Sequence, residues 1–274
     1  MLAFSSLLGN VEGQNIYRIW YDKPASYWEE ALPVGNGRIA AMVFGDPQLE
    51  QIQLNEETVS AGSPYQNYNE EAKTALPEMR RLIFEGKYEE AQNMAATKIL
   101  SQVGNEMPYQ TVGRLNIRYQ DHKKVNNYYR DLDISNAVAV TRYEVDGVEF
   151  TEETFASFTD QLVIRHIKAS KPGTINCELF FNTPMRDPKR SIYGKKGLRL
   201  EGITHGSRYF PGKVHYCADL DVKHKGGKVI TANDTLLSVQ GASELTLYIS
   251  MATNFVNYKD ISGDPYQRNK AYLK

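Results

Sequence analysis

The stretch Asn136–Ser157 (NAVAVTRYEV-DG-VEFTEETFAS) decides the fold class of this chain. Apolar and polar residues alternate on both sides of Asp146-Gly147, and alternation with a period of two is typical of a strand that buries one face. The Asp-Gly pair suits the two left-handed positions of a type I′ turn. The stretch therefore predicts an antiparallel hairpin.

The same alternation recurs along most of the chain. It is clearest in Gln51–Asn55 and Arg114–Tyr119, and Ile39–Phe44 is also predicted to be a strand. Further strands are predicted at 161–169, 174–181, 197–203, 214–223, 228–231, 236–240 and 245–252. Many short strands with close turn signals favour a mainly β fold, built as a large antiparallel sandwich.

One segment departs from this pattern. Glu71–Phe84 and Lys87–Leu100 carry apolar residues at helical spacing, and Gly86 separates them. They predict a short helical hairpin inserted between strands. We expect its aliphatic stripes to face the core.

The composition limits the classes of partner. The chain has 274 residues, a formal net charge of -1 and 41% hydrophobic residues, which is ordinary for a globular protein. A charge near zero gives no electrostatic reason to expect nucleic acid or an anionic membrane as a partner. No stretch after the first residues is apolar enough to span a bilayer. The 18 tyrosines could stack on sugars, but they are also ordinary strand residues.

The first residues and the two cysteines give information about where in or outside the cell the protein is located. Leu2–Leu8 resembles the apolar part of a secretory signal, so residues 1–14 are predicted to be a signal-peptide remnant and the protein to be exported to a periplasm or the extracellular space. Cys177 and Cys217 each lie in a strand-like stretch. Two separate buried thiols are expected, although a disulfide between them stays open.

The sequence contains no recognisable metal or cofactor motif. Its five histidines do not cluster, and Asp131-Leu132-Asp133 lacks the glycine and glutamate of a calcium loop. Gly35–Arg38 superficially resembles a dinucleotide-binding loop, but it precedes a strand instead of opening a helix. We expect a tight turn there, no metal ligands and no cofactor.

Glycoside hydrolysis needs two carboxyl groups about 5–9 Å apart. Adjacent carboxylates on a strand point to opposite faces, so a pair such as Glu152-Glu153 cannot act on one substrate. Glu56 stands at the end of a predicted strand, where a side chain can reach into a cleft. The alternative is a carboxylate that accepts hydrogen bonds from nearby turn amides.

Ten motifs, in order along the chain, resemble those of glycoside hydrolase family 95. They are Ile19–Ala25, Trp28–Arg38, Ala41–Gly45, Ile52–Thr58, Ala61–Pro64, Leu82–Ala91, Pro108–Gly113, Tyr129–Asp133, Asn257–Asp260 and Gly263–Pro265. The family consists chiefly of α-L-fucosidases. Its layout implies an N-terminal β super-sandwich, a helical linker, an (α/α)6 barrel and a C-terminal β domain.

The resemblance implies that residues 15–256 form the super-sandwich and that residues 257–274 begin the linker helix. Asp264 and Pro265 suit the N-cap and first position of that helix, which we expect to have nothing to pack on. The family inverts the anomeric centre with residues of the barrel. We therefore expect no catalytic residue here, and expect the chain to be the front portion of a larger enzyme.

Two departures from the family pattern concern strands. Val59-Ser60 stands where the family usually has Leu-Trp, and Ala40-Ala41 stands where it usually has Gly-Ala. The first departure removes a large aromatic side chain. If that side chain borders the pocket or the barrel, the sugar specificity is altered.

Four residues are predicted to lie near the substrate: Asn55, Glu56, Tyr109 and Gln110. They are polar groups at strand ends, where a β scaffold presents side chains to a ligand. The expected partners are a fucosylated or related oligosaccharide and the catalytic barrel of the parent chain. The rival interpretation is a stand-alone, non-catalytic carbohydrate-binding sandwich.

Overall fold

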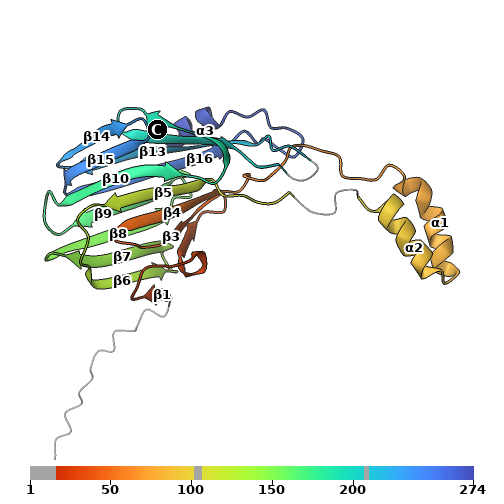
Figure 1. Cartoon of the computed structure of the whole chain (residues 1–274), viewed down its shortest axis with the longest axis horizontal. Coiled ribbons are helices and arrows are strands. Elements are labelled where there is room, and N and C mark those ends of the chain that lie inside the picture. The colour runs from red at the N-terminus through yellow and green to blue at the C-terminus, as the bar shows by residue number, and fades with distance from the viewer. Residues whose placement is uncertain (1–16, 102–106, 207–209) are drawn as a thin grey trace, which may run out of the picture.

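The computed structural model describes residues 17–101, 107–206 and 210–274. Two antiparallel sheets stack face to face (Figure 1). The nine-stranded sheet has, in spatial order, β1 (Arg18–Tyr21), β6 (Asn126–Asp133), β7 (Val138–Val145), β8 (Val148–Ala156), β9 (Val163–Ala169), β16 (Glu244–Thr253), β13 (His215–Lys225), β12 (Gly197–Ile203) and β11 (Arg186–Tyr193). The seven-stranded sheet has β14 (Lys228–Asn233), β15 (Leu236–Ala242), β10 (Ile175–Asn182), β5 (Gly113–Tyr119), β4 (Leu49–Glu56), β3 (Ile39–Val43) and β2 (Leu32–Gly35). The predicted mainly β sandwich is confirmed, while residues 1–14, the predicted signal remnant, lie outside the described residues.

The hairpin predicted from Asn136–Ser157 is β7 and β8. Val145 pairs with Val148 across the turn, and Asp146 and Gly147 have φ angles of 50° and 75°. These are the left-handed values that a type I′ turn requires. The prediction is confirmed in position and register.

The core lies between the two sheets, and β4 shows how the sequence builds it. Ile52 and Leu54 are fully buried, while Gln51 and Gln53 alternate with them on the outer face. The same alternation on both sheets produces one continuous core of aliphatic and aromatic side chains. The sequence pattern therefore fixes which face of each strand is covered.

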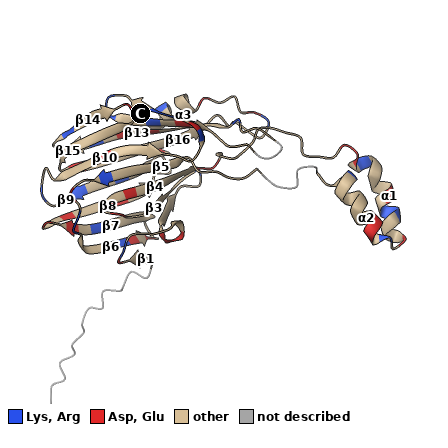
Figure 2. Ribbon diagram, viewed as in Figure 1, with Lys and Arg blue, Asp and Glu red and all other residues tan. Residues whose placement is uncertain are grey.

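A buried ionic cluster interrupts this apolar core. Arg165 lies between Glu50 and Glu152, and its Nη2 is 2.7 Å from Oε2 of Glu50. The hydroxyls of Tyr119 and Tyr143 donate to Oε1 of Glu152 at 2.8 and 2.7 Å. Burial raises the pKa of Glu50 to about 7, although the charge of Arg165 opposes the rise. Figure 2 shows that charges of both signs are otherwise interspersed over the strands and the hairpin.

Four strands were not predicted: β1, β2, β6 and β11. Strand β1 is a short edge strand, β2 contains Pro33, and β6 begins with polar residues. Strand β11 is the opposite edge of the nine-stranded sheet, and none of its residues is fully buried. Strands β1 and β11 are edge strands with little burial, so they lack the apolar alternation on which a sequence-based prediction depends.

The predicted helical hairpin is confirmed, but the packing expected for it is wrong. It consists of α1 (Ala72–Phe84), α2 (Tyr88–Met94) and the π-helical continuation η2 (Ala95–Ile99). Figure 1 shows the hairpin standing apart from the sandwich. Its buried side chains, Ala75, Leu82 and Ala91, lie in the hairpin itself, and none of them belongs to the described core of the sandwich. The apolar stripes therefore cover each other instead of the sheets.

The last helix, α3 (Pro265–Tyr272), has the predicted cap. The Asp264 carboxylate accepts hydrogen bonds from the amides of Tyr266 and Gln267, and Pro265 takes the first helical position. The expectation that this helix has nothing to pack on is wrong. Asn269 is buried against the nine-stranded sheet and donates to the Cys217 carbonyl at 3.0 Å. Packing against β13 and β16 offsets the low intrinsic stability of a short helix.

The two cysteines are separate. Cys177 lies on β10 of one sheet and Cys217 on β13 of the other, and both are buried free thiols. The expectation of two core thiols is confirmed. A single 3-10 turn, η1 (Trp28–Glu30), completes the described helices, and none of them is long and apolar enough to cross a membrane.

Candidate functional site

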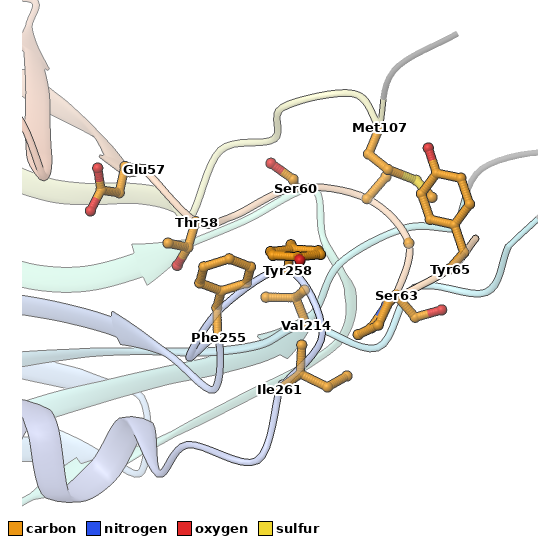
Figure 3. Close-up of a pocket in the computed structure, with 13 residues that line it drawn as sticks. Glu57, Thr58, Ser60, Ser63, Tyr65, Met107, Val214, Phe255, Tyr258 and Ile261 are labelled. Carbon is orange, nitrogen blue, oxygen red and sulfur yellow. The ribbon is translucent and has the colours of Figure 1, made fainter. Parts of the chain in front are cut away.

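The helical hairpin departs from one end of the sandwich (Figure 1). A cavity opens beside the chain that leads to the hairpin (Figure 3). Its volume is about 490 Å³. We call it the strand-end cavity, and its lining residues are Glu57, Thr58, Ser60, Ala61, Gly62, Ser63, Pro64, Tyr65, Met107, Val214, Phe255, Tyr258 and Ile261. A volume of this size lies within the range of small-molecule sites.

Segments far apart in the sequence form the two walls. One wall is the chain that follows β4, and the other is the turn after β16, which contributes Phe255 and Tyr258 (Figure 3). The turn is closed by the Val256 amide, which donates to the Asp260 carbonyl at 2.9 Å. Its Asp260 carboxylate accepts from the Ser262 amide at 2.8 Å. Hydrogen bonds from the Ser262 side chain and amide lower the Asp260 pKa. Three of the motifs that carry the family resemblance, Ile52–Thr58, Ala61–Pro64 and Asn257–Asp260, therefore meet at this cavity.

Glu56 lies beside the strand-end cavity but its carboxylate points into the sandwich. Only 4% of Glu56 is exposed, and its Oε2 accepts from the amide and the hydroxyl of Thr58 at 2.8 and 2.6 Å. Burial raises the Glu56 pKa, whereas the hydrogen bonds from Thr58 and the charge of Arg38 oppose the rise. The turn-amide arrangement considered from the sequence is thus present. The Thr58 hydroxyl also contacts that of Thr253 on the opposite sheet.

Asn55 is separated from Glu56 by the alternation of the strand. It pairs with Ala40 and lies on the same outer face of β4 as Gln53, away from the buried Glu56 carboxylate. The backbone places the two residues next to each other, but their side chains cannot reach one ligand from one face.

Tyr109 and Gln110 join the strand-end loop from the other side of the helical insertion. Tyr109 pairs with Ser60, and its hydroxyl donates to the Glu56 carbonyl at 3.1 Å. The ring remains 55% exposed, and partial burial raises its pKa. Gln110 donates its amide to the Val59 carbonyl at 2.8 Å, and its side-chain oxygen accepts from the His205 amide at 2.9 Å. The structure therefore brings Glu56, Tyr109 and Gln110 into one loop cluster.

Arg38 holds this cluster in place, although no role was predicted for it. Its Nη1 lies 3.4 Å from Oε1 of Glu56 and donates to the Met251 carbonyl of the other sheet at 2.8 Å. Its Nε donates to the Gln161 side chain at 2.6 Å. The predicted tight turn positions it, since Gly37 has φ 95° and the Asn36 side chain accepts from the amides of Arg38 and Ile39. Membership of the family motif was the one sequence signal that pointed to Arg38.

Tyr258, Phe255 and Met107 were also missed as parts of a site. Tyr258 is 73% exposed and belongs to the Asn257–Asp260 motif, which was noted only for its resemblance. Ser60, where the family usually carries tryptophan, lines the same cavity, whereas its neighbour Val59 is fully buried. The first departure from the family pattern thus lies on the cavity wall.

The strand-end cavity is lined mainly by uncharged side chains. Among the described residues that line it, Glu57 is the one carboxylic acid, whereas glycoside hydrolysis uses two. The other lining groups are hydroxyls, aromatic rings and aliphatic side chains, which suit either a sugar or another protein surface. No group of three or more metal-ligating side chains occurs within residues 17–101, 107–206 and 210–274.

Comparisons with known proteins show the family of this chain. Residues 19–258 match the N-terminal domain of glycosyl hydrolase family 65. The chain is 31% identical over 271 residues to "Alpha-L-fucosidase 2" of Arabidopsis thaliana, covering 89% of this chain and 31% of that protein. It is 26% identical to "Probable alpha-fucosidase A" of Aspergillus niger, covering 86% of this chain and 30% of that protein. The chain thus spans about a third of the length of these curated relatives.

A solved structure shows the same fold. It is described as "Putative kojibiose phosphorylase from human microbiome", and the superposition has a TM-score of 0.52 at 10% identity, covering 96% of this chain and 35% of that chain. The resemblance to the N-terminal domain of the α-L-fucosidase family is confirmed by the relatives. The match over residues 19–258 shows that the chain belongs to the glycosyl hydrolase family 65 N-terminal domain family.

Proposed function

We propose that this chain is the N-terminal domain of an α-L-fucosidase of glycoside hydrolase family 95. In the full-length enzyme, terminal α-L-fucosyl linkages of glycans would be hydrolysed with inversion by residues of an (α/α)6 barrel. The observation that carries this proposal is the 31% identity to "Alpha-L-fucosidase 2" over 89% of the chain. The ten motifs found along the sequence support the same assignment.

The role proposed for this domain is to pack on the barrel and to border its active-site mouth. The loops Asn55–Thr58 and Tyr109–Gln110 supply the border. Hydrogen bonds from Tyr109 to Glu56 and from Gln110 to Val59 hold these loops together, so they can present side chains in a fixed arrangement. The half-exposed Tyr109 ring and the apolar lining of the strand-end cavity support a surface that another body covers.

The proposal extends to the organisation of the chain. Residues 15–256 form the sandwich domain, and residues 257–274 lead toward the barrel by way of α3. Export to a periplasm or the extracellular space is part of the proposal. N-terminal sequencing of the mature protein would test export, since cleavage near residue 14 is expected.

The activity is tested on the full-length parent with a terminal α-L-fucoside of an oligosaccharide. NMR should detect β-L-fucose as the first anomer released, because inversion of an α linkage yields the β sugar. Release of α-L-fucose first would contradict the inverting mechanism. Failure to release fucose from any α-fucoside would contradict the assignment as a fucosidase.

The bordering role is tested separately with Tyr109→Ala and Gln110→Ala in the same parent. We expect kcat/KM to fall by about tenfold or more, with the melting temperature unchanged, because a positioning contact to the substrate is lost. Tyr88→Ala is the matched control, since Tyr88 is an exposed ring on the separate hairpin. Unchanged kcat/KM in both site variants would show that these loops do not border the active site.

A further inference from the structure

The outer face of the nine-stranded sheet carries a pair of aromatic rings, of which Trp20 is exposed and Tyr129 is partly buried. Trp20 on β1 is 61% exposed, and its ring lies 6.3 Å from that of Tyr129 on β6, with the two planes tilted by 19°. An exposed tryptophan does not contribute the free energy that burial of its apolar surface would add to folding. We call this pair the aromatic platform.

A groove with polar side chains begins at the aromatic platform. It has a volume of about 300 Å³, and Tyr129 lines it together with Asn127, Arg142, Glu144, Glu149 and Thr151. Tyr129 is directly opposite Arg142 on β7, and Arg142 is opposite Thr151 on β8. Residues in register on one face are neighbours, so the groove continues the platform across three strands.

The backbone of β6 is irregular at this point. The pairing of β6 with β7 shifts between Asn126 and Tyr129, and Asn127 has a left-handed φ of 52°. Bulges redirect side chains and are enriched beside functional sites. Here the Asn127 side chain donates to Oε2 of Glu144 at 3.0 Å, which fixes an amide and a carboxylate beside the Tyr129 ring.

We propose that the aromatic platform and its groove bind a neutral pyranose unit of a glycan. The apolar C–H face of the sugar would stack on the exposed Trp20 ring, which Tyr129 supports, because aromatic faces attract partly positive C–H groups. Its hydroxyls would exchange hydrogen bonds with Asn127, Arg142 and Glu144, which offer both donors and acceptors. The groove carries one guanidinium and two carboxylates, Glu144 and Glu149, so it favours a neutral sugar over a uronic acid.

This site is separate from the strand-end cavity. Strands β1 and β6 lie at the edge of the sandwich, whereas the strand-end cavity lies where the helical hairpin departs (Figure 1). The inference does not depend on the proposed function, because a glycan-binding surface serves a hydrolase and a non-catalytic domain alike. It assigns a binding role to residues that the strand-end loops do not use.

The test is a fluorescence titration of the 274-residue chain with 2′-fucosyllactose and with cellohexaose. The Trp28→Phe variant leaves Trp20 as the single tryptophan of the sequence, so a change in emission reports on the platform. We expect a saturable change with at least one of these neutral probes and none with trigalacturonic acid. Trp20→Ala, followed by calorimetric titration, should weaken binding by about tenfold or more, as truncation of an aromatic anchor does at other interfaces.

Two further variants separate binding from folding. Tyr129→Phe should retain binding, because the ring face is kept, whereas Arg142→Gln should weaken binding without a change in melting temperature. Trp28→Ala is the matched control, since Trp28 is also an exposed tryptophan. The proposal is overturned if neither neutral probe gives a saturable response, if Trp20→Ala binds as the parent does, or if acrylamide fails to quench Trp20. The last outcome would show that another protein surface covers the platform.

Discussion

The Arg38 guanidinium lies between the two sheets, 3.4 Å from the buried carboxylate of Glu56. The same nitrogen donates to the Met251 carbonyl on β16 at 2.8 Å, and the guanidinium lies 4.7 Å from the Tyr272 ring of α3. One side chain thus connects the strand-end loop, the nine-stranded sheet and the last helix. It is the link between the fold and the candidate site.

Replacing Arg38 should destabilise the fold through Glu56. Arg38→Met leaves a buried carboxylate without its cation, and we expect a loss of about 3 kcal/mol in the free energy of unfolding, measured with urea. Glu56→Gln combined with Arg38→Met should recover part of this loss, because the uncompensated charge is gone. A free energy of unfolding for Arg38→Met within about 0.5 kcal/mol of the parent is what a neutral surface change gives. That result would show that the ion pair does not stabilise the fold.

The buried cluster around Arg165 should make stability depend on pH. The folded protein binds the Glu50 proton more tightly than the unfolded chain does, because burial raises this pKa from 4.5 to about 7. Stability from this group is therefore fully present below pH 4.5 and is lost as the pH rises through about 7. The expected change is on the order of 3 kcal/mol.

Glu50→Gln provides the control for this pH dependence. The variant keeps the shape of the side chain and removes its titration, so its free energy of unfolding should vary less between about pH 5 and pH 8. Urea unfolding at several pH values measures both proteins. Parallel curves for the two proteins would show that Glu50 does not titrate in this range.

How far the sequence predicts this fold depends on the range of the interactions. The β7–β8 hairpin was predicted correctly because Asp146 and Gly147 determine their own turn. The partners of Arg38 lie 123 and 213 residues along the chain at Gln161 and Met251, so no local pattern contains them. The edge strand β11 was missed because its residues are not fully buried and therefore carry little alternation.

In the candidate site, too, local features were predictable from the sequence and long-range contacts were not. Glu56, Tyr109 and Gln110 were predicted from their places at strand ends, and the structure brings them together. The alternation of β4 sends Asn55 to the other face, which the sequence pattern alone could have indicated. The opposite wall of the cavity, with Phe255 and Tyr258, depends on how β16 packs beside β13 and β9, which is a property of the whole sandwich.

Both cysteines should be unreactive in the folded protein. Cys177 and Cys217 are buried, and burial raises the pKa of each thiol, so little thiolate is available to attack a disulfide reagent. We expect no reaction with Ellman's reagent in buffer and two reactive thiols in concentrated guanidinium. Thr231→Cys on the exposed edge strand β14 is the control, and it should react at once in buffer. Rapid reaction of a native thiol would contradict the burial of its strand.

The helical hairpin should open independently of the sandwich. Its described core consists of Ala75, Leu82 and Ala91, while Phe84 is 88% exposed, so little apolar surface stabilises it. We expect amides of residues 72–99 to exchange with deuterium at least about 100-fold faster than those of β13 and β16, since short helix pairs with small cores have low opening free energies. Leu82→Ala should accelerate exchange in the hairpin further and leave the urea midpoint of the sandwich unchanged. Equal protection of the hairpin and of β13 would instead show that another surface, such as a second copy of the chain, covers the hairpin in solution.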